Sequence, residues 1–154
     1  MYKRQVLDGK IYAMGAMGGF DGAGFLLDTA EVYDPQADSW QRVASMPQRL
    51  CEHAAAAMGG KIYVTGGRNQ GSFLKSVYVY DPQADAWTQL TSMGTARHAH
   101  ASAAVGGKLY VFGGYGGAAM ERLSTAEVYD PASDGWAQVT SLTSERIGMP
   151  AIAF

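Results

Sequence analysis

Three copies of one sequence pattern run along the chain and constrain its fold more than any other feature. Gly-Lys-Ile-Tyr begins at residue 9 and again at residue 60, and Gly-Lys-Leu-Tyr begins at residue 107. Each copy continues to Tyr-Asp-Pro, and a tryptophan follows that tyrosine by seven residues, as Trp40, Trp87 and Trp136. Because the tryptophans are 47 and 49 residues apart, we expect a series of repeated structural units of that length.

Each unit reads as four short strands separated by glycine and proline turns. In the second unit the predicted strands are 54–58, 61–65, 76–80 and 86–90. Gly59-Gly60 separates the first two strands. Asp81-Pro82 opens a type I turn between the last two, because proline presets φ and aspartate can cap free amides. No helical periodicity crosses these breaks, so the predicted class is all-β.

These marks occur together at fixed spacing and resemble kelch repeats over nearly the whole chain. The shared pattern is a strand of small residues, then Gly-Gly-Lys-Ile-Tyr-Val-x-Gly-Gly, then Val-Tyr-x-Tyr-Asp-Pro-x-x-x-x-Trp. The first unit departs from it, with Gly15-Ala16 where the others have Gly66-Gly67 and Gly113-Gly114. The chain looks most similar to the kelch domains of ubiquitin-ligase adaptor proteins. The resemblance implies β-propeller blades of four antiparallel strands.

The number of units is small for a propeller, since rings close with roughly four to eight blades. We expect one domain over 1–154, with blades at about 2–45, 53–92 and 100–141 and an extra strand at 149–154. Two interpretations stay open. The chain is a fragment of a longer propeller or an engineered sub-propeller, or it is a half-propeller that closes with a second copy into a six-bladed homodimer.

The surplus strand bears on the second interpretation. In such a ring Met149–Phe154 could supply the inner strand of the partner's first blade. Tyr2–Leu7 matches that place less well, because Lys3, Arg4 and Gln5 stand where the second unit has alanines.

The segment between the second and third strands is the one whose length differs between units. Length variation at one loop position is typical of a binding face. The variable loops are expected at Met17–Asp28, Arg68–Lys75 and Tyr115–Ser124. They supply aromatic, arginine and asparagine side chains as candidate partner contacts: Phe20, Arg68, Asn69, Phe73, Tyr115 and Arg122. Aromatic residues and arginine are enriched at interface hot spots. For Phe73 the alternative of a plug between blades stays open.

One arginine recurs in each connection between units, nine or ten residues after the tryptophan, as Arg49, Arg97 and Arg146. The resemblance places these connections on the same face as the variable loops and implies that such arginines can line a pocket for an acidic peptide. A guanidinium group binds carboxylates through two parallel hydrogen bonds. The alternative is that these arginines tie neighbouring blades together by bonding to loop carbonyl groups.

Other repeated residues favour structural roles. The tyrosine and tryptophan of each unit are expected in the core with their polar tips hydrogen-bonded. His53 and His100 recur at equivalent positions, which favours hydrogen bonds between blades over metal ligation. Cys51 is the single cysteine, so no disulfide forms within the chain. No orienting partner for a cysteine nucleophile is identifiable.

These observations favour a non-enzymatic module that binds a protein or an acidic peptide, with no catalytic residue, cofactor or metal. A sugar-active enzyme similar to the mutarotases among kelch-like propellers is the alternative, with Arg97, Glu145 and Arg146 as nominees. A net charge of −2 without runs of like charge disfavours nucleic acid and membrane surfaces as partners. No apolar stretch reaches the roughly 18 residues of a membrane span, and no signal peptide is readable, so a cytoplasmic protein is expected.

Overall fold

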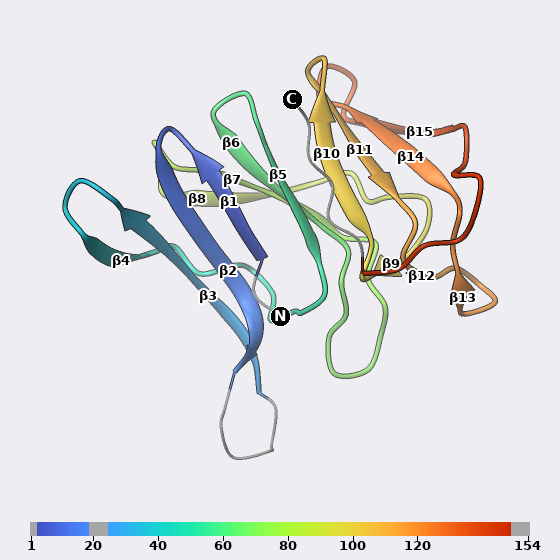
Figure 1. Ribbon diagram of the computed structural model, residues 1–154, viewed down its shortest axis with the longest axis horizontal. Coiled ribbons are helices and arrows are strands. Elements are labelled where there is room, and N and C mark those ends of the chain that lie inside the picture. The colour runs from blue at the N-terminus through green and yellow to red at the C-terminus, as the bar shows by residue number, and fades with distance from the viewer. Residues whose placement is uncertain (1–2, 19–24, 149–154) are drawn as a thin grey trace.

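Three four-stranded antiparallel sheets form an open arc in the computed structural model, which describes residues 3–18 and 25–148 (Figure 1). Blade 1 consists of β1 (Lys3–Leu7), β2 (Lys10–Gly18), β3 (Phe25–Asp34) and β4 (Ser39–Val43). Blade 2 consists of β5 (Ala54–Met58), β6 (Lys61–Thr65), β7 (Val77–Asp81) and β8 (Ala86–Leu90). Blade 3 consists of β10 (Ala101–Val105), β11 (Lys108–Phe112), β14 (Ala126–Asp130) and β15 (Gly135–Val139). The predicted all-β architecture of four-stranded blades is confirmed.

The turns of blade 2 have the aspartate capping and the glycine conformations that the sequence predicts. Asp81 Oδ1 accepts a hydrogen bond from Gln83 N at 2.9 Å, and this capping fixes the turn between β7 and β8. Gly59 and Gly60 both have positive φ between β5 and β6, a conformation that glycine adopts without steric cost. Three of the four strands predicted for blade 2 have the bounds that the structure shows, and the remaining one is shifted by one residue, to Val77–Asp81.

The inner strands β1, β5 and β10 lie next to one another along the inside of the arc. Lys3–Leu7 pairs with β2 and takes the inner position of blade 1. The chain's own β1 therefore occupies the inner place that the half-propeller interpretation assigns to Met149–Phe154 of a partner copy. Residues 149–154 lie outside the described part of the chain. Strand β1 lacks the alanines that β5 has at the equivalent positions. Instead, Gln5 Nε2 donates a hydrogen bond to Ala55 O, which links β1 to β5.

Two of the predicted variable loops contain more regular structure than expected. Strand β2 extends to Gly18 and β3 begins at Phe25, with a register shift between Met14 and Ala16. The described residues of the predicted loop Met17–Asp28, at 17–18 and 25–28, are therefore paired strand. In blade 3, β12 (Tyr115–Gly116) pairs with β13 (Glu121–Arg122) and with β9 (Arg97–His98). Variation in length between the units predicted loops here, but backbone pairing forms strands in parts of both segments.

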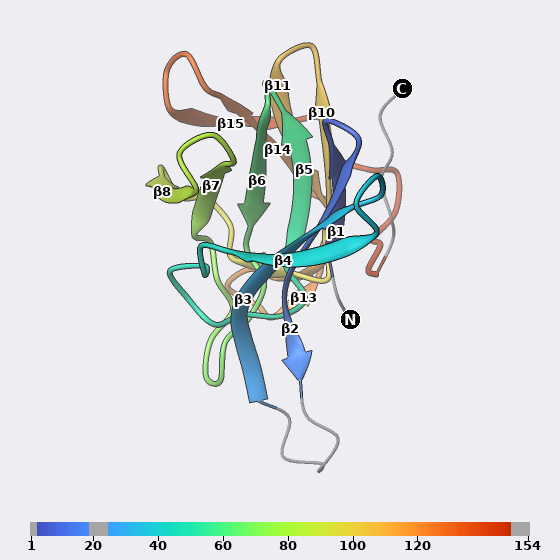
Figure 2. The ribbon, with the colours of Figure 1, turned by 90° about the vertical axis from the view of Figure 1, so that its left-hand side faces the viewer.

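The hydrophobic core consists of two layers between successive blades, which lie one behind another when seen from blade 1 (Figure 2). Between blades 1 and 2, Tyr12 lies 6.0 Å from Tyr80, measured between ring centroids. Between blades 2 and 3, Tyr63 lies 6.3 Å from Tyr129 in the same arrangement. We call the contact between two successive blades a joint; the joint of blades 2 and 3 thus has the same tyrosine pair as the joint of blades 1 and 2.

The repeated tryptophans do not share one environment. Trp87 Nε1 donates to Ala44 O at 2.8 Å and Trp136 Nε1 donates to Thr91 O at 2.9 Å, so each joins its blade to the preceding one. The expectation that all three tryptophans are core residues is wrong for Trp40, whose side chain is 52% exposed. Trp40 lies on the outer face of blade 1, where no blade precedes it in the described residues.

His100 and His53 are fully buried. The Nε2 atom of His100 lies 2.9 Å from Thr65 Oγ1, which links the approach to β10 with β6 and supports the predicted bond between blades. In the residues that the structure describes, no helix is long and apolar enough to cross a membrane.

Candidate functional site

The connections between second and third strands and the connections between blades meet at one end of the arc, the lower end in Figure 1, which we call the loop end. Backbone hydrogen bonds interlock the two kinds of connection. Cys51 and Arg68 exchange bonds of 3.0 and 2.9 Å, and Gly67 N donates to Arg97 O at 2.9 Å. The loop end is therefore a continuous surface built by all three blades.

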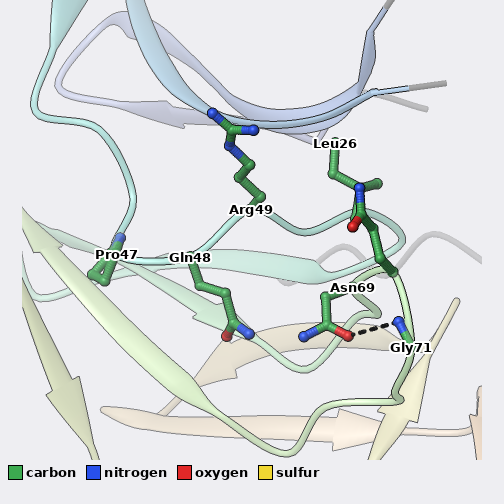
Figure 3. A pocket seen from close by; sticks show the side chains of 7 residues that line it. Leu26, Pro47, Gln48, Arg49, Asn69 and Gly71 are labelled. Carbon is green, nitrogen blue, oxygen red and sulfur yellow. Dashed lines mark hydrogen bonds between the residues drawn. The ribbon is translucent and has the colours of Figure 1, made fainter. Parts of the chain in front are cut away.

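A cavity of about 500 Å³ opens between blades 1 and 2 at the loop end, and we call it the inter-blade groove (Figure 3). Its lining comes from β3, from the connection between blades 1 and 2, and from the variable loop of blade 2. The lining residues are Leu26, Pro47, Gln48, Arg49, Asn69, Gln70 and Gly71. Two of the predicted contact residues, Arg49 and Asn69, are thus brought together from different blades.

The amide groups of the groove are oriented by their own hydrogen bonds. Asn69 Oδ1 accepts from Gly71 N at 3.2 Å and from Ser72 N at 3.0 Å, which leaves Nδ2 as the free end of the amide. Gln48 Oε1 accepts from Tyr78 OH at 3.3 Å. Figure 3 shows the two amide nitrogens directed toward one another across the groove. The groove therefore presents N–H donors.

Arg49 adds a positive charge to the same groove. Its side chain is 68% exposed, and its Nε lies 3.5 Å from Asp28 Oδ2. Figure 3 shows the guanidinium directed away from the two amides, toward blade 1. An ion pair this exposed contributes at most about 1 kcal/mol, so Arg49 can exchange Asp28 for a ligand carboxylate at little cost.

A second group of side chains, the stacked cluster, lies at the loop end of blades 2 and 3. It consists of Glu52, Arg68, Phe73, His98 and Tyr115. The rings of Phe73 and His98 stack at 4.3 Å, and Tyr115 presents its edge to Phe73 at 5.9 Å. Glu52 accepts two hydrogen bonds from Arg68, of 3.1 and 3.2 Å, and lies 3.5 Å from His98 Nε2. The cluster joins three of the predicted contact residues to two others.

Electrostatics leave the stacked cluster without net charge at neutral pH. Hydrogen bonding to Glu52 raises the pKa of Arg68, so the two form a stable ion pair. Burial lowers the pKa of His98, an effect that the Glu52 charge partly opposes, and the ring is therefore neutral. Burial also raises the pKa of the neighbouring Cys51 thiol. A protonated thiol is a poor nucleophile.

Arg97 has an environment unlike that of the other two repeat arginines. Its side chain is fully buried, with Nη1 donating to Gly113 O at 2.9 Å and to Thr125 O at 3.1 Å. Nη2 donates to Glu127 Oε1 at 2.7 Å. Bonding to loop carbonyl groups is the structural alternative named above, and in this position Arg97 holds the connection between blades 2 and 3 against blade 3.

The remaining candidates lie at the edge of the loop end. Arg122 is exposed on β13, opposite Tyr115 in the pairing with β12. Arg146 has an exposed side chain, and its backbone carbonyl accepts from Gly114 N at 2.7 Å. Phe20 lies outside the described residues.

Sequence reasoning missed Gln48, Gln70, Glu52 and His98 as members of the two sites. The glutamines lie in ordinary loop sequence, and no motif marks them. Glu52 has a φ of 54°, a left-handed conformation that composition does not reveal. His98 joins the cluster through the pairing of β9 with β12, which depends on the fold. Among residues 3–18 and 25–148, no group of three or more His, Cys, Asp or Glu side chains could hold a metal ion.

Comparison with known proteins identifies what the whole arrangement resembles. A family model described as the KLHDC2/KLHL20/DRC7 Kelch-repeats domain matches residues 5–150. Kelch-like protein 35 of Homo sapiens is 37% identical over 70 residues, and alpha-scruin of Limulus polyphemus is 39% identical over 62 residues. N-acetylneuraminate epimerase of Shigella sonnei is 33% identical over 69 residues. These alignments cover 46%, 40% and 44% of this chain but 11%, 6% and 19% of those proteins, so the chain matches a small part of each.

Proposed function

The chain belongs to the kelch-repeat family, and from this premise we propose that it is a non-enzymatic binding module that holds a protein or peptide segment at its loop end. The observation that carries the proposal is the inter-blade groove, where Arg49 and Asn69 line one cavity from two blades. The class of ligand follows from the chemistry of the groove.

The groove suits an acidic peptide. Its polar groups include the amide nitrogens of Gln48 and Asn69 and the guanidinium of Arg49. N–H donors bind carboxylates and peptide carbonyl groups, and bonds to carboxylates are strengthened by charge. Leu26 and Pro47 add apolar surface to the same cavity. An extended segment with a Glu or Asp side chain, or with a free carboxyl terminus, matches this lining.

The other predicted contacts have supporting roles in this proposal. Phe73 and Tyr115 present rigid aromatic surface in the stacked cluster, beside the Arg68–Glu52 pair. Exposed Arg122 and Arg146 attract an acidic partner to the loop end, because rim charges act mainly on association rates. Arg97 supports the surface from beneath. Phe20, in the first variable loop, stays a predicted contact.

A direct test uses a short fluorescein-labelled peptide of alternating Glu and Gly residues, with binding measured by fluorescence polarisation. The same peptide with Lys in place of Glu should bind much more weakly. Arg49→Ala should weaken binding about 10-fold or more, because a hydrogen bond to a charged group contributes about 1.5–3 kcal/mol. Asn69→Ala should weaken it less, because its amide is uncharged.

The matched control for Arg49→Ala is Arg42→Ala, because Arg42 is an exposed arginine on β4 outside the groove. Its replacement should leave the affinity unchanged. If neither Arg49→Ala nor Asn69→Ala alters binding of the acidic peptide, the inter-blade groove is not the contact site.

The similarity to N-acetylneuraminate epimerase calls for a separate measurement of catalysis. NMR spectra of N-acetylneuraminate with and without the protein would report any acceleration of its interconversion. We expect no acceleration above the uncatalysed rate. Acceleration that Glu145→Gln or Arg146→Ala removes would replace the binding module with the enzyme alternative.

We also propose that two copies assemble into a six-bladed ring as a homodimer in the cytoplasm, with a fragment of a longer or engineered propeller as the alternative. Three blades in an open arc support assembly, since closed propellers have roughly four to eight blades.

A further inference from the structure

The outer faces of the two terminal blades carry exposed apolar side chains. On blade 3, Leu109 and Val111 pack against blade 2, so the alternate residues Tyr110 and Phe112 face outward. Together with Val105 and Val139 they line a hollow of about 360 Å³. Val105 is 57% exposed. On blade 1 the corresponding exposed ring is that of Trp40. Surfaces of this kind mark interaction sites.

The joints inside the chain show how such faces are covered. In blade 2, Asp85 Oδ1 accepts from Ala44 N at 2.8 Å while Trp87 Nε1 donates to Ala44 O at 2.8 Å. In blade 3, Asp134 Oδ1 accepts from Thr91 N at 3.2 Å while Trp136 donates to Thr91 O. In both joints the Asp and Trp of one blade bind both backbone groups of one residue, four positions after the tryptophan of the preceding blade.

Both halves of a third joint are present in the chain. Blade 1 has Asp38 and Trp40 at the equivalent positions, and they are held in the same geometry as in the other blades. Tyr33 OH donates to Asp38 Oδ1 at 2.7 Å, and the Tyr33 ring lies 5.2 Å from Trp40. On blade 3, Thr140 follows Trp136 by four residues and lines the hollow.

The glutamate of the buried ion pair between blades 2 and 3 also has an equivalent in blade 1. Glu127 accepts hydrogen bonds from Gly94 N at 2.6 Å, from Thr95 N at 3.2 Å and from Arg97, which follows the tryptophan of blade 2 by ten residues. The segment Thr-Ala-Glu-Val-Tyr-Asp-Pro around this glutamate occurs identically in blade 1, where the glutamate is Glu31.

Arg146 stands ten residues after Trp136 and is the counterpart of Arg97. Its side chain is exposed, and so is that of Glu31, at 44%, with Arg42 at 3.8 Å. Blade 2 has Tyr78 at the glutamate position, and the arginine that precedes it, Arg49, remains exposed. The chain thus carries an unburied glutamate on one terminal blade and an unburied matching arginine after the other.

We infer that the outer face of blade 3 receives blade 1 of a second copy, with Asp38 and Trp40 of one copy binding the backbone of Thr140 of the other and Glu31 accepting from Arg146. Tyr33 then packs against Tyr110, as Tyr80 packs against Tyr12 inside the chain. This inference rests on the proposed assembly and names its contacts. The contact is head-to-tail, and two of them close a ring of two copies.

Sedimentation equilibrium of the full chain over a concentration series tests the inference. We expect a mass of about twice the 16.4 kDa of one chain. Glu31→Arg and Arg146→Glu should each raise the dimer Kd by about 30-fold or more, since each leaves two like charges at the joint. The double variant should restore the dimer, because every joint then carries the reversed pair. An equimolar mixture of the two single variants should do the same.

Glu121→Arg is the matched control, because Glu121 is an exposed glutamate on β13 at the loop end, and this change should leave the Kd unaltered. Circular dichroism should show that each charge variant is folded, since both altered side chains are exposed in the single chain. A wild-type chain that stays monomeric at every concentration overturns the inference and points to a longer propeller. Persistence of the wild-type Kd in the Glu31→Arg and Arg146→Glu single variants also overturns it. Neither result depends on the peptide-binding measurement, so the two proposals fail separately.

Discussion

Arg97 Nη2 lies 2.7 Å from Glu127 Oε1 at the joint of blades 2 and 3, and the two side chains are 0% and 3% exposed. The carboxylate also accepts from the backbone of Gly94 and Thr95. A buried ion pair persists when further hydrogen bonds compensate the lost hydration of its groups. Here backbone carbonyl groups accept from Arg97 Nη1 and backbone amides donate to Glu127, while the buried Arg97 Nε has no partner among the described residues.

Replacing Arg97 should therefore destabilise the chain strongly. Arg97→Met leaves the Glu127 carboxylate buried without its cation and should lower the free energy of unfolding by about 3–5 kcal/mol. Urea denaturation followed by tryptophan fluorescence measures this loss. Arg49→Met, at the equivalent but exposed position, should cost less than about 1 kcal/mol. Equal losses for the two variants would contradict the distinction between the two environments.

The tryptophans of blades 1 and 2 offer a comparison of the same substitution with and without a preceding blade. Trp87→Phe removes the bond to Ala44 O and should lower the free energy of unfolding by about 1 kcal/mol. Trp40→Phe should have little effect on the single chain, because Trp40 is exposed. Both should be measured by urea denaturation in the Glu31→Arg background, where no dimer joint contributes. A larger loss for Trp40→Phe would contradict the arrangement.

Two glycines with positive φ test the close approach of the connections. At Gly66 an added Cβ would collide with the Arg97 carbonyl oxygen, whereas at Gly60 it would meet open space. Gly60→Ala should cost about 1 kcal/mol from backbone strain alone. Gly66→Ala should cost about 1–3 kcal/mol more, because the connection must shift. Thermal unfolding of the two variants side by side gives the difference, and equal melting temperatures would be inconsistent with this packing.

His98 should titrate below its ordinary pKa of 6.5, because burial disfavours the charged ring. The folded chain then binds fewer protons than the unfolded chain just below pH 6.5. The stability that neutral His98 contributes is complete above pH 6.5 and is lost as the pH falls through the folded pKa. NMR of the imidazole nitrogens measures the midpoint.

Glu52→Gln should lower the His98 midpoint further, because the Glu52 charge favours the protonated ring. Glu121→Gln, at an exposed glutamate outside the stacked cluster, should leave the midpoint where it is. A His98 midpoint at or above 6.5 in the wild-type chain would show that burial is not the dominant influence.

The candidate site was only partly predictable from sequence. Variable loop length and residue type pointed to Asn69, and recurrence after the tryptophan pointed to Arg49; the structure places both in one groove. Gln48 contributes equally to that groove but stands in unmarked loop sequence. The Gln48 amide is oriented by a hydrogen bond from Tyr78, which lies 30 positions later in the chain, on blade 2. This bond forms only because blades 1 and 2 pack together.

The sequence by itself determined the four-stranded units and most strand limits, because glycine turns, Asp-Pro turns and apolar runs act over a few neighbouring residues. Tertiary structure alone decided which of the equivalent arginines is buried. Burial of a guanidinium requires a carboxylate that compensates its lost hydration. Arg97 pairs with Glu127, which lies on blade 3, 30 residues later in the sequence. Blade 2 has Tyr78 at the position of that glutamate, so Arg49 stays exposed, and Arg146 has no further blade among the described residues. The blade that follows each arginine in the chain therefore decides whether that arginine is buried or exposed.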